Sequence, residues 1–181
     1  FYLLVENINY FLKFANYYLM NYINNSNGQS LSFNNAAILN LVIENLAGKI
    51  NISGQSYVKN FVALPTDGTI KISGSTFVKN LVVSSVTAIN VNGNAGIELI
   101  YLIFSLGQIT LSDYSAINTI ELTSSGGIIT LNDYSSVENL NVNDSEVYLY
   151  LNDSSIIVNL KCHNSEINIT TSGSPTIINI N

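Results

Sequence analysis

Apolar residues recur about every twenty residues along this chain, and polar residues alternate with them over short segments. The clearest apolar column is the first position of a repeated frame, apolar–any–Asn–apolar. Its members are Ile38, Val58, Val78, Ile97, Ile117, Val137, Ile157 and Ile177. Only the step from 78 to 97 differs from twenty residues. A fixed period of this length is typical of a solenoid, in which each coil buries its apolar face only against its neighbours.

Further apolar columns keep the same period, and the positions between them are mostly polar. One such column is Ile50, Ile70, Ile89, Ile109, Ile129, Leu149 and Ile169. Alternation of this kind indicates short β-strands. The predicted fold class is therefore all-β, a single-stranded parallel β-helix over residues 28–181. Its seven to eight coils of about twenty residues each contain about three short strands and three corners.

One predicted corner has the same kind of residue in every coil. Its column is Gly54, Gly74, Gly93, Asp113, Asp133, Asp153 and Gly173. Glycine, asparagine and aspartate tolerate a positive φ, so this column predicts a tight turn repeated in register.

The first 27 residues have a different pattern, with apolar residues at spacings of three and four. They include Leu4, Ile8, Phe11, Ala15 and Leu19. This spacing predicts an amphipathic helix that forms a separate segment, 1–27, and that ends near Gly28. The helix either caps the open end of the solenoid or serves in oligomerisation or anchoring.

The asparagine of the repeated frame marks another corner. It is present at Asn40, Asn60, Asn80, Asn139, Asn159 and Asn179. This column resembles the asparagine ladder of right-handed parallel β-helix proteins, the pectate-lyase-like superfamily that includes viral tailspikes and bacterial adhesins. The resemblance covers about residues 30–181 and implies a right-handed coil with amide bonds between successive rungs. It implies no single activity, because that superfamily contains lyases, hydrolases, adhesins and inert spikes.

Composition narrows the range of functions. The chain has six lysines, no arginine and a net charge of −6, which argues against a nucleic-acid partner. It has one cysteine and one histidine, so neither an intramolecular disulfide nor a histidine cluster can form. No run of 18 apolar residues predicts a transmembrane helix. We expect no cofactor.

The aspartates of the corner column, Asp113, Asp133 and Asp153, are the best candidates for chemistry. Coils lie about 4.8 Å apart, so the three carboxylates would stack closely. That arrangement suits a Ca²⁺ site or a glycosidase-like carboxylate pair. A structural role in the tight turn also explains the aspartates, because glycine occupies the same column in other coils. Lyases of the superfamily use Lys or Arg beside an Asp cluster, and no Lys lies on this corner within a coil of the column.

Tyr101, Ile103 and Phe104 belong to a coil in which Leu99 replaces the ladder asparagine. With Val62 and Val82 they predict an apolar patch that is either an interface or a surface covered by the N-terminal helix or a loop.

Five asparagines lie in glycosylation sequons, which matter if the protein is secreted. They are Asn24, Asn51, Asn143, Asn152 and Asn168.

These features together predict a non-catalytic extracellular structural protein, the subunit of a cell-surface or virion spike, fibre or filament. The alternative is a polysaccharide-binding or polysaccharide-degrading tailspike-like protein, for which Tyr114 and Tyr134 beside the aspartate column would provide aromatic faces. The expected partners are copies of the same chain and surface glycans. We expect the contacts between copies to use the C-terminal coil, the N-terminal helix or the patch around Tyr101.

Overall fold

A computed structural model describes residues 20–25, 30–44, 48–64, 68–85, 87–103 and 107–181. All regular elements in these ranges are β-strands, and they form two parallel sheets. The predicted all-β parallel solenoid with a repeat of about twenty residues is confirmed.

The larger sheet contains the nine odd-numbered strands in chain order. They are β1 (Met20–Asn25), β3 (Ala37–Glu44), β5 (Tyr57–Leu64), β7 (Phe77–Ser84), β9 (Gly96–Ile103), β11 (Ala116–Thr123), β13 (Ser136–Asn143), β15 (Ile156–His163) and β17 (Thr176–Ile180).

The second sheet contains eight even-numbered strands in the same order. They are β2 (Leu31–Asn34), β4 (Lys49–Ser53), β6 (Thr69–Ile72), β8 (Ala88–Val91), β10 (Gln108–Leu111), β12 (Gly126–Leu131), β14 (Glu146–Asp153) and β16 (Glu166–Gly173).

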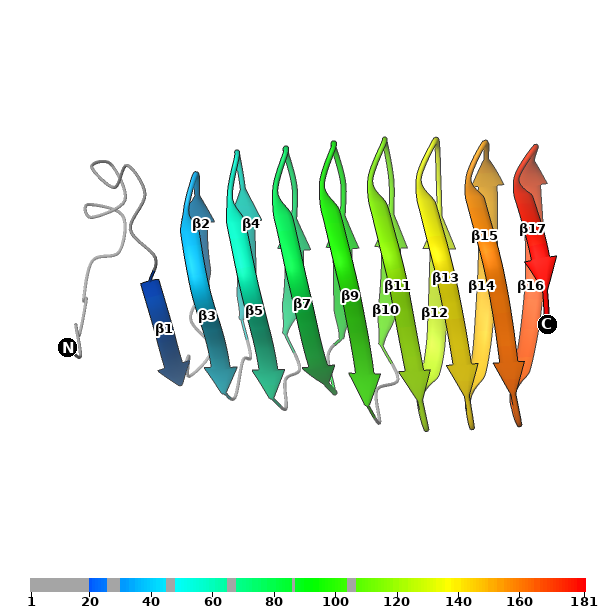
Figure 1. Cartoon of the computed structure of the whole chain (residues 1–181), viewed down its shortest axis with the longest axis horizontal. Helices are drawn as coiled ribbons and strands as arrows, with labels where there is room; N and C mark the ends of the chain where they lie inside the picture. The colour runs from blue at the N-terminus through cyan, green and yellow to red at the C-terminus, as the bar shows by residue number, and fades with distance from the viewer. Residues whose placement is uncertain (1–19, 26–29, 45–47, 65–67, 86, 104–106) are drawn as a thin grey trace.

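The chain alternates between the two sheets and advances along one axis (Figure 1). Odd-numbered strands lie in front and run down the view, while even-numbered strands lie behind and run up. Because the chain moves from left to right as it winds, the coil is right-handed (Figure 1).

Each coil contains two strands instead of the three that the pattern predicts. The long odd-numbered strand passes through the asparagine corner without ending. In β5 the buried residues are Val58, Phe61 and Ala63, so the inward spacing is three residues across Asn60 and two beyond it. The asparagine corner is therefore a bend inside one strand, and the two short strands predicted beside it are continuous.

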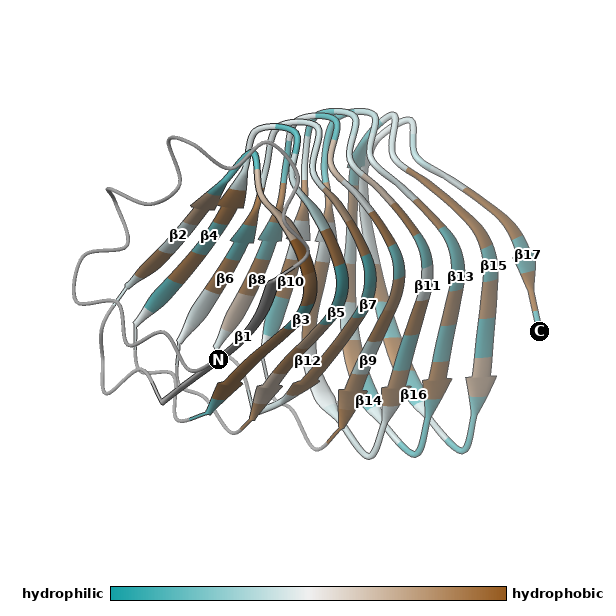
Figure 2. Cartoon of the chain, turned by 60° about the vertical axis from the view of Figure 1, so that its left-hand side comes forward, coloured by the Kyte–Doolittle hydropathy of each residue, from teal (hydrophilic) through white to brown (hydrophobic). Residues whose placement is uncertain are grey.

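The core consists of the predicted inward columns, stacked one residue per coil between the two sheets. Parallel pairing in register places Ile50 beside Ile70 and Ile109 beside Ile129. These residues are at most 3% exposed. Apolar bands consequently line up across successive strands, with polar bands between them (Figure 2). Burial in this arrangement contributes roughly 25 cal/mol for each Å² of apolar surface removed from water.

The predicted tight turn is present in every coil of the column, because all of its residues have positive φ. The values for Asp113, Asp133 and Asp153 are 60°, 58° and 57°. Gly74 has φ +75°, and a Cβ there would lie 2.8 Å from the carbonyl oxygen of Gly54. Stacking with the neighbouring turn therefore requires glycine at that position.

The end of the predicted N-terminal helix is wrong, because residues 20–25 form strand β1 and pair in parallel with β3. Strand pairing with β3 prevails here over the local helical spacing. Residues 1–19 lie outside the described residues. Within the described part of the chain, no helix has the length and apolar character needed to cross a membrane.

Candidate functional surfaces

The predicted asparagine ladder is present and has two runs of three rungs. In the first run Asn60 Nδ2 donates to Asn40 Oδ1 at 2.8 Å, and Asn80 Nδ2 donates to Asn60 Oδ1 at 3.0 Å. In the second run Asn159 donates to Asn139 at 2.9 Å. Asn179 donates to Asn159 at 2.8 Å. The rungs of Asn40 to Asn159 are half-buried, so the ladder follows the bend of the sheet and stays outside the core.

Leu99 and Thr119 occupy the rungs between these two runs. Asn118 partly closes this gap. Its Oδ1 accepts from Asn139 Nδ2 at 3.4 Å and from Thr119 Oγ1 at 3.2 Å. Sequence spacing did not predict this contact, because Asn118 lies one position before the ladder column.

The aspartate column binds backbone N–H groups of the preceding coil. One Oδ of Asp113 accepts from the N–H of Gly93 at 2.8 Å, and one of Asp133 accepts from the N–H of Asp113 at 2.9 Å. Asp153 accepts in the same way from Asp133 at 3.2 Å. Each carboxylate therefore stabilises the turn before it. Within the described ranges, no group of three or more His, Cys, Asp or Glu side chains is arranged to hold a metal ion.

Serine forms a second ladder, at the opposite corner, that the sequence reading missed. Ser145 Oγ accepts from the N–H of Ser125 at 3.0 Å and donates to the carbonyl of Asn143 at 2.6 Å. Ser165 Oγ accepts from the N–H of Ser145 at 3.1 Å. The sequence does contain a signal for this ladder, because serine recurs at 125, 145 and 165 with the period of the coil.

Another serine column lies buried at the tight turn. Ser115, Ser135 and Ser155 are 0% exposed. Their hydroxyl oxygens have no hydrogen-bond partner among the described residues. In earlier coils the equivalent Ser56 and Thr76 hydroxyls donate to the turn carbonyls of Ser53 and Ser73. In the later coils the backbone N–H of the serine donates to the equivalent turn carbonyl instead, as Ser135 N–H does to Asn132 O at 3.1 Å.

The predicted apolar patch follows one outward column on the nine-stranded sheet. Parallel register places Val42, Val62, Val82 and Tyr101 side by side on β3, β5, β7 and β9. All four are half-buried, and so is Ile103 two residues further along β9. Phe104 lies outside the described residues. The column becomes polar at Glu121, so the apolar character is confined to the first coils.

The five sequons differ in accessibility. Asn24 lies in β1, and Asn51 and Asn143 are half-buried on β4 and β13. Asn152 is half-buried, and its Nδ2 donates to Asn132 Oδ1 at 2.9 Å. Asn168 is exposed on β16 and is the most accessible acceptor of the four whose side chains are described.

A shallow groove of about 640 Å³ runs across the coils on the nine-stranded sheet. Its floor contains the small residues Gly96, Ala116 and Ser136, and Phe77 stands at one end. Phe77 stacks on Tyr57 with ring centroids 6.1 Å apart. Polar residues along the groove are Glu98, Asn118 and Glu138. Glu98 lies 3.9 Å from Lys79 Nζ.

Tyr114 and Tyr134 lie two residues before Ala116 and Ser136 in their coils. Their rings stack with centroids 5.2 Å apart and planes inclined by 5°. They are 65% and 61% exposed, so the pair presents aromatic surface to solvent beside the aspartate column.

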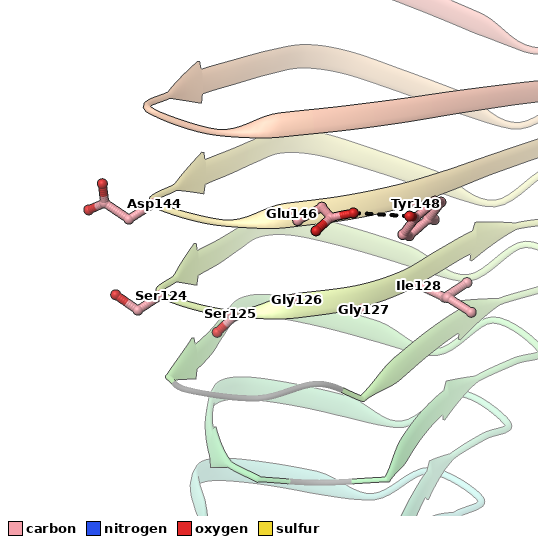
Figure 3. A pocket seen from close by; sticks show the side chains of 8 residues that line it. All are labelled: Ser124, Ser125, Gly126, Gly127, Ile128, Asp144, Glu146 and Tyr148. Atoms are coloured by element: carbon pink, nitrogen blue, oxygen red, sulfur yellow. Dashed lines mark hydrogen bonds between the residues drawn. The ribbon is translucent and has the colours of Figure 1, made fainter.

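A second recess lies where Gly126 and Gly127 begin β12, and Figure 3 shows the residues that line it. Tyr148 on the next coil donates its hydroxyl to Glu146 Oε1 at 3.0 Å (Figure 3). This hydrogen bond and the negative charge of Glu146 raise the pKa of the Tyr148 phenol above its ordinary value. The recess is open and acidic, with Asp144 at its rim.

The chain matches no protein-family model, no curated protein and no solved structure.

Proposed function

We propose that this chain is a non-catalytic extracellular structural protein, a subunit of a spike, fibre or filament on a cell or virion surface. The observation that carries the proposal is the uninterrupted stack of coils. From β10 onward, each described corner has at most four residues, as in Ser112–Ser115 between β10 and β11. Two continuous hydrogen-bonded sheets along one axis make a stiff rod, which suits a mechanical or spacing role.

Surface chemistry supports the extracellular part of the proposal. Only 10% of the residues are charged, and the outward row of the eight-stranded sheet that contains Thr110, Thr130 and Thr170 is mostly Asn, Ser, Thr and Tyr. Asn168 offers an exposed sequon on a strand. Copies of the same chain are the proposed partners, because a structural subunit of this kind acts by assembling.

Electron microscopy of the purified protein tests this proposal. We expect stiff rods, about 35–40 Å long for one copy at about 4.8 Å per coil, that align into longer or thicker assemblies as the concentration rises. Dispersed single particles at every concentration would contradict the structural role.

Polysaccharide binding is the second candidate, and the groove beside Tyr114 and Tyr134 favours it. Exposed aromatic rings and carboxylate or amide groups are the features that sugars contact. The groove has both, with Phe77 at one end and Glu98, Asn118 and Glu138 along it. The absence of a free cation in its lining favours a neutral or basic glycan over an acidic one.

A glycan panel separates the two candidates. Binding that disappears in a variant with both Tyr114→Ala and Tyr134→Ala would favour the second candidate. The matched control is Tyr150→Ala, which removes an exposed tyrosine from the other sheet. We expect no glycan of the panel to bind in a way that depends on Tyr114 and Tyr134.

A further inference from the structure

The outward face of the eight-stranded sheet has opposite charges at its two ends. Lys49 on β4 and Lys71 on β6 are exposed near the N-terminal end. Glu146 on β14 and Glu166 on β16 are exposed near the C-terminal end. We call the outward surface from β4 to β16 the even face. The nearest members of the two pairs, Lys71 on β6 and Glu146 on β14, lie four strand steps apart in this sheet. At about 4.8 Å per step they are roughly 19 Å apart, about twice the screening length at physiological salt, so they attract each other little within one copy.

Large apolar side chains lie on the even face at its acidic end, on β12 and β14. Ile128, Tyr148 and Tyr150 are 38%, 44% and 37% exposed. Parallel pairing makes them neighbours on β12 and β14 (Figure 3 shows Ile128 and Tyr148). The centre of the face is polar and uncharged, with Gln108 and Thr110 on β10.

We propose that two copies of this chain pair through their even faces, with their solenoid axes antiparallel. This inference rests on the proposed function and names the surface through which the subunits would associate. A two-fold axis along β10 places the lysine end of each copy on the glutamate end of the other. The charge pattern is therefore complementary to itself after this rotation, as an isologous interface requires.

The strand register specifies which rows meet. Ladder pairing puts Lys71, Asn90, Thr110, Thr130 and Tyr150 in one outward row. The rotation about β10 brings Lys71 over the ring of Tyr150, a cation–π contact. In the neighbouring row it brings Ala88 opposite Ile128. Lys49 comes opposite Asn168, within reach of Glu166 two residues along the strand.

The size of the even face predicts a weak dimer. Seven strands at about 4.8 Å and four residues at about 3.3 Å give a footprint of roughly 400 Å² per copy. Two copies then bury about 800 Å², below the roughly 1,200 Å² of standard stable interfaces. We expect a dissociation constant between about 1 µM and 1 mM. Salt should weaken the pair, because part of its attraction is between exposed charges.

Charge reversal provides the test, with the 181-residue protein produced in bacteria so that Asn168 carries no glycan. The acidic variant has Lys49→Glu and Lys71→Glu, and the basic variant has Glu146→Lys and Glu166→Lys. The control has Lys59→Glu and Lys161→Glu, which makes the same charge change as the acidic variant, but at exposed sites on the nine-stranded sheet. All six positions are exposed, so the substitutions should not affect folding, and circular dichroism checks this.

Sedimentation equilibrium over micromolar to millimolar concentration measures association. We expect the wild type and the control to dimerise, each reversed variant to associate at least ten-fold more weakly, and an equimolar mixture of the two variants to recover the dimer. If the wild type associates but the mixture does not recover, the even face is the wrong surface, while the assembling role remains. A wild type that stays monomeric throughout would overturn both the pairing and the self-assembly in the proposed function.

Discussion

At the residue scale, single amides and carboxylates connect each coil to the next. An asparagine in the middle of a ladder run both donates to one neighbour and accepts from the other, whereas Asn80, which is followed by Leu99 in the next coil, makes one ladder bond, to Asn60. Asn60 is a middle rung, and Asn80 is the end rung of the same run. The difference between these two positions gives a measure of what one rung contributes.

We expect Asn60→Leu to lower the free energy of unfolding by about 1–2 kcal/mol, because two ladder bonds are lost. Asn80→Leu should cost about half as much, because one bond is lost. Leucine fits this column sterically, as Leu99 shows in the following coil. Urea unfolding measures both values. Equal costs would mean that the side chains act through packing and not through the ladder.

The aspartate column gives a second prediction. Asp133→Asn should change the free energy of unfolding by less than about 0.5 kcal/mol, because asparagine tolerates positive φ and keeps an acceptor for the Asp113 N–H. Asp133→Ala loses both properties and should cost about 1–2 kcal/mol. Thermal and urea unfolding measure the difference. A large cost for the asparagine variant would show that the negative charge itself is required.

The Tyr148 phenol provides a pH prediction. Its pKa is raised by the hydrogen bond and charge of Glu146, so the folded state binds this proton more tightly than the unfolded state does. The stabilising contribution is present below the ordinary tyrosine pKa and is lost as the pH rises through the folded value. Glu146→Gln should lower the pKa of Tyr148 toward that ordinary value. Ultraviolet titration of this variant against the wild type measures the shift, with Tyr148→Phe assigning the signal.

At the element scale, the two corners of a coil use serine in opposite ways. The corner between odd and even strands uses its serine hydroxyls to join coils, as at Ser145. The tight turn between even and odd strands buries Ser135, whose hydroxyl has no partner among the described residues. Alanine already fits the tight-turn column, because Ala95 is buried there at 1% exposure.

Ser135→Ala should therefore be neutral or stabilise the fold by up to about 1 kcal/mol, since it removes a buried polar group without a partner. Ser145→Ala should cost about 1–3 kcal/mol, because it removes the acceptor of the Ser125 N–H and the donor to Asn143. Urea unfolding of the two variants, carried out in parallel, measures both changes in the free energy of unfolding. A clear loss of stability in Ser135→Ala would show that this hydroxyl has a partner in solution.

At the scale of the whole molecule, each coil contacts only its neighbours, so stability is spread along the axis and is lowest where a neighbour is absent. Leu140 on β13 lies between two coils and is 0% exposed. Ile180 on β17, at the C-terminal end of the stack, is 65% exposed. Both occupy the same inward column.

Leu140→Ala should cost about 2–4 kcal/mol through lost burial and the cavity that remains. Ile180→Ala should cost less than about 0.5 kcal/mol, because its side chain is mostly in water. Because a stack of coils can unfold in parts, hydrogen exchange should accompany the denaturant curves, with slower exchange in β11 and β13 than in β17. Equal protection along the whole axis would contradict this gradient.

The repeat, the inward columns, the positive-φ turn and the rungs of the asparagine ladder could all be predicted from the amino-acid sequence. These features depend on one residue per coil at a fixed period, and parallel stacking in register preserves that period. The period alone therefore predicts the inward column from Ile38 to Ile177 and the turn residues Asp113, Asp133 and Asp153.

The neighbour that each polar group contacts depends on the folded structure. It made one strand continuous through Asn60, made residues 20–25 a strand, and directed the Asp113 and Asp133 carboxylates to backbone N–H groups. It also placed Lys71 and Tyr150 in one outward row. The physical reason is that the period specifies stacking along the axis, whereas the cross-section of the coil, set by packing between the two sheets, determines the direction of each side chain.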